Sequence, residues 1–185
     1  ATYFYENTVA RPARGGEYTE GIVGQPIRIN PVVVANNDTD RDLIEVLFAD
    51  LITLAENYTT TNDNKTWNVT LKPDLKWSDG EPLTADDVIF TIETIQDPEA
   101  LSPLFSSWQG VVAERLSERE IRFTLKTPYV FFLDNLKNLK IVPFHAFSGV
   151  PPANLHLAQY NLEPIGSGPY KFISYEKEKS GFITN

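Results

Sequence analysis

Residues 76–91 read KWSDGEPLTADDVIFT, and their order predicts a turn followed directly by a helix. Ser78-Asp79-Gly80 is typical of a turn, since Gly accepts positive φ angles and Asp bonds to nearby backbone. Thr84 with Asp87 resembles a capping box in which Asp replaces the usual Glu. The apolar residues that follow recur at helical spacing as far as Asp97-Pro98, where we expect the helix to end.

Sequences on both sides of this stretch predict strands. Residues 67–72 alternate apolar and polar side chains, and the polar turn at 62–65 makes them part of a hairpin or a meander. Residues 121–125 alternate in the same way and are expected to pair with 111–116. We expect a last strand where 166–172 leads toward the end of the chain.

The N-terminal part predicts a strand, a turn and a helix. Residues 17–29 predict a strand with an extended continuation, and Asn30-Pro31 then turns the chain. The polar cluster at 36–40 is rich in helix-capping residues, and the apolar residues after it predict a helix over about 40–52. Residues 129–136 predict a further short helix.

The composition is typical of a globular chain. Hydrophobic residues make up 42% of the 185 residues, and no apolar run approaches the roughly 20 residues needed to cross a bilayer. The net charge of -9 is spread along the chain, which argues against nucleic acid or an anionic membrane as a partner. The absence of cysteine excludes disulfides and thiolate chemistry.

The usual catalytic residues are sparse. His145 and His156 form neither a helical i, i+4 pair nor a three-ligand zinc set, so we expect no metal and no other cofactor. The sequence lacks the motifs of serine hydrolases, phosphate-binding loops and dinucleotide sites. Asp86 and Asp87 are better explained by the helix dipole than by glycosidase chemistry. We therefore expect that the protein is not an enzyme.

Aromatic residues provide the main alternative interpretation. Trp67, Trp77, Trp108 and Phe105 supply large amphipathic surfaces that suit the wall of a ligand cleft. Core packing explains Trp67 and Trp77 more simply, whereas both interpretations stay open for Trp108, which lies in a polar loop. A secreted carbohydrate-binding module or hydrolase domain that uses cleft aromatics is therefore one alternative, and an interaction domain without a small ligand is another.

The stretch 76–91, joined to WNVTLKPDL before it and IETIQDPEALSP after it, resembles the signature region of the solute-binding proteins of peptide and nickel ABC importers. That oligopeptide- and dipeptide-binding family has an aromatic strand, a KWSDG turn, a helix start of the form LTA-D-V-F and a later Asp-Pro. GQPIRINP followed by DRDLIEVLF, and GSGPYKF near the end, extend the resemblance over about 17–175.

The resemblance implies an α/β fold: a periplasmic-binding-protein-like lobe with a mixed β-sheet and flanking helices. It implies the capture of peptides or related small solutes and their delivery to an ABC permease in the membrane. The implied location is extracytoplasmic, in the periplasm or as a lipoprotein at the outer face of the cell membrane. Family members are longer, so we expect an N-terminal fragment with the opposing lobe missing and with weak or absent ligand binding.

The resemblance also implies how the chain is divided. We expect an irregular lead-in over 1–16 and the first strands of the ligand-binding lobe over 17–40. An inserted α/β subdomain is expected over 41–148, and a truncated return segment to the first lobe over 149–185.

The implied ligand site combines two segments, and its residues are Val34, Ala35, Asn36, Leu104, Phe105 and Trp108. Ala35 stands where some oligopeptide binders carry an acidic residue, which leaves backbone pairing with an extended ligand as the alternative mode of recognition. Nickel, sugars and opines are further ligands that the same scaffold suits.

Overall fold

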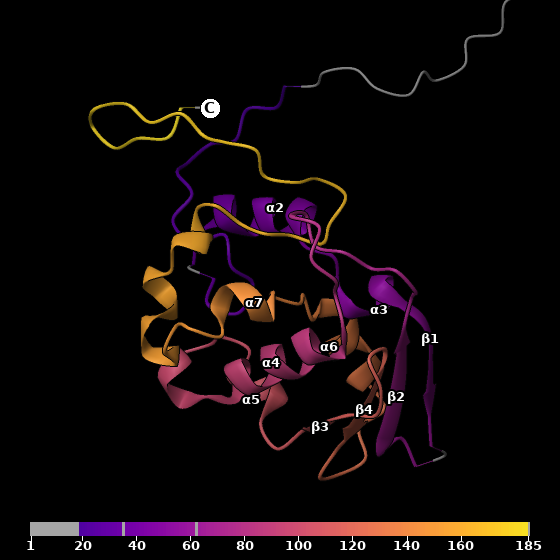
Figure 1. Ribbon diagram of the computed structural model, residues 1–185. Helices are drawn as coiled ribbons and strands as arrows, with labels where there is room; N and C mark the ends of the chain where they lie inside the picture. The colour runs from indigo at the N-terminus through magenta and orange to yellow at the C-terminus, as the bar shows by residue number, and fades with distance from the viewer. Residues whose placement is uncertain (1–18, 35, 62, 185) are drawn as a thin grey trace, which may run out of the picture.

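A computed structural model of the protein describes residues 19–34, 36–61 and 63–184 (Figure 1). The longest helix has 12 residues, and no helix in these ranges is long and apolar enough to cross a membrane. In chain order the elements are α2 (Asp38–Leu47), α3 (Leu51–Leu54), β1 (Ala55–Thr60), β2 (Thr66–Leu71), α4 (Ala85–Gln96), η1 (Pro98–Ala100), α5 (Phe105–Trp108), β3 (Val112–Arg115), β4 (Glu120–Thr124), α6 (Phe132–Asn138), α7 (Phe144–Phe147), η2 (Pro152–Leu157) and η3 (Gln159–Asn161).

Four strands form one sheet in the order β1-β2-β4-β3. The predicted hairpin of β1 and β2 is present, and β2 pairs with β4 so that Trp67 lies opposite Phe123. The predicted pairing of β3 with β4 is present as well, with Ala113 opposite Phe123. The α/β class is confirmed, and in the described residues the sheet is antiparallel throughout and not mixed.

The sheet and the helices α3, α4, α5, α6 and α7 enclose the larger apolar core. Alternate residues of β2 and β4 point into it, because successive side chains of a strand face opposite sides. The largest side chains in this core are aromatic, and they surround Phe132: its ring centre lies 5.9 Å from that of Trp67, 5.5 Å from Trp108 and 6.0 Å from Phe123.

Helix α4 begins and ends where the sequence predicts. Its capping box is complete, since the Asp87 carboxylate accepts a hydrogen bond from Thr84 N and the Thr84 hydroxyl accepts one from Asp86 N. The helix ends at Gln96, and Asp97 then caps the short helix η1.

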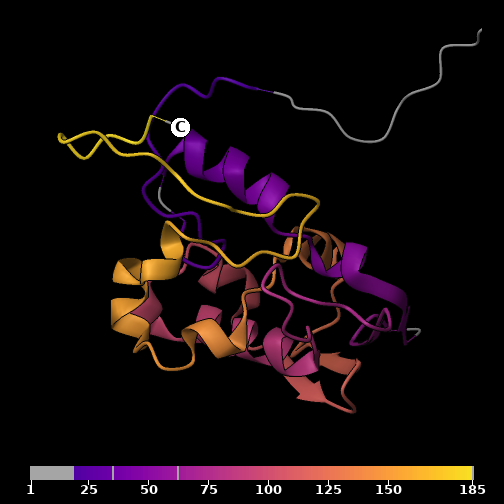
Figure 2. The same ribbon diagram turned by 45° about the horizontal axis from the view of Figure 1, so that its top comes forward.

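Helix α2 lies over a second, smaller core, which consists of Ile29, Ile44, Leu47 and Phe48. The buried Asp40 carboxylate accepts hydrogen bonds from the backbone N–H groups of Ile27 and Arg28, which ties the N-terminal segment to the first turn of α2. The C-terminal segment runs along the same helix in both views (Figures 1 and 2).

The predicted helix over 40–52 was wrong at its C-terminal end. Helix α2 stops at Leu47, Phe48 is extended, and a new helix begins at Leu51 with Asp50 as its cap. The interruption frees Leu47 O to accept a hydrogen bond from Gly168 N, and Leu51 N donates to Leu139 O. Tertiary hydrogen bonds therefore outweigh the helical spacing at this point.

Two predicted strands do not form. Neither the described part of 17–29 nor 166–172 joins a ladder, because no described strand lies beside them to exchange backbone hydrogen bonds. The predicted helix at 129–136 starts later, at Phe132, and runs to Asn138. The expected lead-in over 1–16 lies outside the described residues.

Candidate functional site

The stretch that opened the sequence analysis forms a joint with two other segments. Ser78 N donates to Gly166 O over 2.9 Å, and Gly166 N donates back to Ser78 Oγ over 3.2 Å. Gly168 N donates to Leu47 O over 2.8 Å. A Cβ atom on Gly166 would lie 2.0 Å from Leu47 O, so only glycine permits this backbone contact. We call these four residues the joint.

A buried carboxylate holds the next segment against the same turn. Asp87 accepts hydrogen bonds from Thr84 N and Phe144 N, each over 2.8 Å. Burial raises the pKa of the Asp87 carboxyl, although both hydrogen bonds oppose that change. The Trp77 indole also favours the charged form, yet its Nε1 is buried without a hydrogen bond of normal geometry.

Helix α7 is held to the turn by a second carboxylate. His145 Nε2 lies 2.9 Å from Asp79 Oδ2, and Asp79 Oδ1 accepts a hydrogen bond from Glu81 N. Both contacts join segments of the chain to one another, so these polar residues of the signature stretch position backbone segments. Among the described residues no cluster of three or more His, Asp or Glu side chains is placed to hold a metal.

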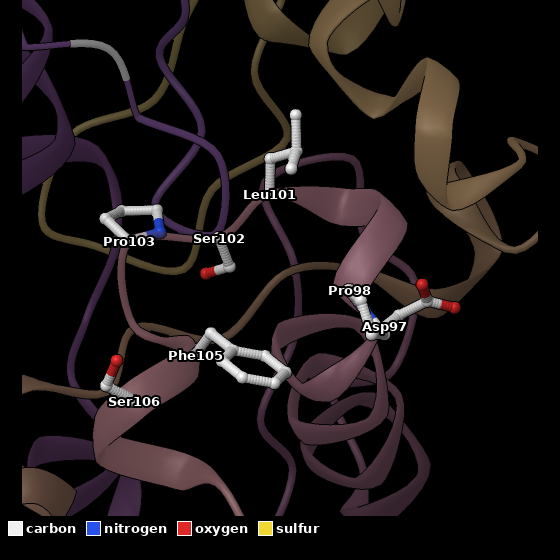
Figure 3. A pocket seen from close by; sticks show the side chains of 7 residues that line it. All are labelled: Asp97, Pro98, Leu101, Ser102, Pro103, Phe105 and Ser106. Atoms are coloured by element: carbon white, nitrogen blue, oxygen red, sulfur yellow. The ribbon is translucent and has the colours of Figure 1, made fainter.

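A cavity of about 510 Å³ lies between the end of α4 and the start of α5 (Figure 3). Its volume is within the range of small-ligand sites. The Phe105 ring lies between the turn that carries Leu101 and the end of α4, and Ser102 lies on the loop that leads from Leu101 toward Phe105. The lining residues are Asp97, Pro98, Leu101, Ser102, Pro103, Phe105 and Ser106.

Side-chain hydrogen bonds hold the backbone of the cavity wall that carries Phe105. Gln96 Nε2 donates to Trp108 O over 2.6 Å and to Val111 O over 2.7 Å, and Asn135 Nδ2 donates to Ser107 O over 3.2 Å. Trp108 itself packs against the ring of Phe123, with 6.1 Å between the ring centres. The cavity therefore has a rigid floor, as a binding site requires.

The structure separates the second group of predicted site residues. Phe105 lines the cavity, Leu104 is half-buried against the larger core, and Trp108 is buried in that core and does not line the cavity.

The first group lies on the loop before α2. Val34 packs against the smaller core, and Asn36 is exposed and accepts a hydrogen bond from Arg41. Ala35 lies outside the described residues. No hydrogen bond joins the described members of this group to the cavity around Phe105.

Sequence reasoning missed all of the cavity wall except Phe105, namely Asp97, Pro98, Leu101, Ser102, Pro103 and Ser106. The Asp97-Pro98 and Ser102-Pro103 pairs are typical of helix ends and turns. Such a pattern does not indicate that the segment between them encloses a cavity.

The three tryptophans are core residues in this structure. Trp67, Trp77 and Trp108 are 4%, 2% and 2% exposed. The carbohydrate-binding or hydrolase alternative depended on aromatic rings that face a cleft, and these three rings face the core. The tryptophans therefore do not support the carbohydrate-binding or hydrolase alternative.

Comparison with known proteins identifies the family. Residues 53–182 match the family described as bacterial extracellular solute-binding proteins, family 5 middle. The oligopeptide-binding protein AppA of Bacillus subtilis is 28% identical over 93% of this chain and 34% of its own length. Protein XP55 of Streptomyces lividans is 33% identical over 89% of this chain and 31% of its own length.

Solved structures agree. The ABC transporter substrate-binding protein CtaP of Listeria monocytogenes superposes with a TM-score of 0.75 at 34% identity, over 84% of this chain and 33% of its own. AppA of B. subtilis in complex with a nonapeptide gives a TM-score of 0.75 at 28% identity, over the same two fractions. The chain thus spans about a third of the length of these relatives, and the predicted family is confirmed. The protein belongs to the family 5 bacterial extracellular solute-binding proteins.

Proposed function

We propose that this chain forms one lobe of the solute-binding component of an ABC importer, which captures peptides or related small solutes and delivers them to a membrane permease. The observation that carries the proposal is the cavity beside Phe105, held on a rigid frame by Gln96 in a chain of this family. Peptides are favoured because relatives are named for oligopeptide binding, and one was solved with a nonapeptide.

The proposed action is capture without chemistry. The protein would work outside the cytoplasm, in the periplasm or anchored to lipid at the outer face of the cell membrane. The family's description as extracellular supports this location, and the spread of negative charge along the chain supports the absence of nucleic acid partners.

We propose that the ligand contacts Phe105 and Leu104 on one side and the loop of Val34, Ala35 and Asn36 on the other. Trp108 then acts as a support beneath the cavity. One lobe covers one face of a ligand, so most of the ligand surface stays in water. We therefore expect the isolated chain to bind with a Kd weaker than about 0.1 mM.

Thermal shift and calorimetry with a panel of probes test the proposal. We expect the peptide pentaalanine to raise the unfolding midpoint at millimolar concentration, and a mannose oligosaccharide or a nickel–histidine complex to have no effect. Ligand that binds only the folded state stabilises it by mass action. A response to the sugar or to nickel alone would contradict the peptide assignment, and no response to any probe at about 10 times the expected Kd would contradict solute binding by this lobe.

A matched pair of variants locates the binding. Phe105→Ser should abolish the peptide-induced shift, whereas Phe131→Ser removes an exposed aromatic ring outside the cavity and should preserve it. Equal effects of the two substitutions would argue that the peptide binds elsewhere.

A further inference from the structure

Leu101 occupies a conformation and an environment that both disfavour leucine. Its φ and ψ angles are 51° and 38°, in the left-handed region, where the Cβ atom of an L-residue is crowded. Its side chain is 84% exposed to solvent. A large apolar group in water, on strained backbone, contributes nothing evident to the stability of the fold.

The local turn does not need a leucine at this position. Leu101 N donates to Pro98 O over 3.3 Å, and Ala100 N donates to Asp97 O over 3.1 Å. Both are backbone contacts that Gly or Asn would make as well, with less strain. The reason for leucine therefore lies in what its side chain faces.

Leu101 stands at the rim of the cavity beside Phe105, with its side chain open to solvent. Leu101 lines this cavity together with Pro98, Pro103 and Phe105, which supply apolar walls (Figure 3). The structure thus gathers an exposed aliphatic side chain, a half-buried aromatic ring and two prolines around one volume of about 510 Å³.

Two polar side chains of the cavity bond to their own loop. Asp97 Oδ1 accepts a hydrogen bond from Glu99 N over 2.8 Å, and Ser102 Oγ accepts one from Leu104 N over 3.3 Å. Asp97 lines the cavity, in a chain whose net charge is -9. An acidic ligand group would be repelled here, whereas an apolar group would lose only its contact with water.

We propose that this cavity accepts one aromatic or branched aliphatic side chain of the bound solute, and that Leu101 is a residue that selects it. The proposal rests on the solute-binding function above and adds a ligand class to it. The chain keeps a strained leucine because the apolar contact occurs only when the ligand is present.

Stability measurements separate this role from a structural one. Leu101→Asn and Leu101→Gly should raise the thermal unfolding midpoint, since both residues tolerate the left-handed region and little packing is lost. Leu116→Asn is the matched control, because Leu116 is also an exposed leucine, at 45%, but lies in the β3–β4 turn without a positive φ. A fall in the midpoint of both Leu101 variants would show that Leu101 stabilises the fold and would overturn the proposal.

Methyl NMR of the full 185-residue chain tests the ligand class directly. N-acetyl-phenylalaninamide should shift the Leu101 methyl signals and bind about tenfold more tightly than N-acetyl-alaninamide, because its ring is buried in the cavity. Leu101→Asn should reduce that preference to less than about threefold, and Leu116→Asn should retain it. Equal affinity of the wild-type chain for both probes, or unchanged Leu101 signals, would overturn the proposal.

Pentapeptides distinguish failure of this inference from failure of the proposed function. If pentaalanine and its variant with a central phenylalanine bind equally well, peptide capture stands and the apolar selectivity of the cavity is refuted. If N-acetyl-phenylalaninamide binds at Leu101 but neither pentapeptide binds, the apolar cavity stands and peptide capture by this lobe is refuted.

Discussion

The residues from α3 to α7 (51–147, the sheet unit) and the residues around α2 (19–50 and 162–184, the α2 unit) are stabilised in different ways. The sheet unit has continuous ladders and a large core of buried apolar residues. The α2 unit buries only four apolar residues in its core and is held mainly by side chains that bond to backbone, such as Asp40 and Asn37. Several large apolar residues of this unit stay exposed, among them Ile22, Val23, Tyr170 and Ile173.

This difference shows that a strand needs both a suitable residue pattern and a neighbouring strand to pair with. Residues 166–172 have the residue types of a strand, as 67–72 do, but only the latter find partners on both sides in the described chain. In 166–172, Gly168 N and Tyr170 N donate to carbonyls at the end of α2, and Gly166 bonds to Ser78, so turns and a helix end replace the strand partners of a ladder. The sheet unit should therefore dominate the stability of the chain.

The largest expected effect breaks the core of the sheet unit. Phe132→Ala should lower the free energy of unfolding by about 3–5 kcal/mol, because it leaves a cavity among three aromatic rings. Urea titration followed by tryptophan fluorescence measures it. Phe131→Ala is the control. The Phe131 ring is 64% exposed, so its removal should lower the free energy of unfolding by less than about 0.5 kcal/mol. Similar costs for both would mean that the core is not centred on Phe132.

A smaller effect is expected at the joint between the two units. Gly166→Ala forces a Cβ atom against Leu47 O and should cost about 1–3 kcal/mol. Hydrogen exchange of the Gly168 amide should accelerate, because the backbone segment beside α2 is displaced. Gly149→Ala, where an added Cβ meets nothing within 4 Å, should change neither quantity. An unchanged Gly168 exchange rate in Gly166→Ala would mean that the added Cβ atom does not displace this segment from the end of α2.

The third effect is at Asp87 and depends on pH. Asp87→Asn should cost about 1–3 kcal/mol, because an amide can accept only one of the two backbone N–H bonds. Since burial raises the pKa of Asp87, the folded protein keeps this proton to higher pH than the unfolded chain. Wild-type stability from this group is therefore greatest below the usual pKa of 3.8 and falls as the pH rises through the raised pKa.

Denaturation of wild type and Asp87→Asn from about pH 3 to about pH 7 measures this dependence. The difference in unfolding free energy between the two proteins should be larger at the acidic end of this range than at the neutral end. Asp86→Asn removes an exposed partner of Arg115 and should cost less than about 1 kcal/mol without this pH dependence. If the difference in unfolding free energy between wild type and Asp87→Asn does not vary with pH, the raised pKa of Asp87 is contradicted.

Local patterns predicted much of the sheet unit from the sequence. The capping residues of α4, the hairpin at 62–65 and the alternation of β2 and β4 each depend on neighbours a few residues apart, so they are legible without the fold. Of the residues that line the cavity, the sequence analysis named only Phe105 as a site residue. Leu101 was missed because its significance lies in a φ angle and an exposure that no sequence pattern displays.

The sequence by itself determined the family, the class of fold and the start of α4, because these follow from residue types at short spacing. Tertiary structure alone decided that helix α2 stops at Leu47, that Trp108 is buried in the larger core and that Gly166 joins the two units. The physical reason is distance along the chain. The segment at 166–168 meets Leu47 and Ser78 through hydrogen bonds between residues about 90 to 120 positions apart, and the energy of such contacts exists only once the chain has folded.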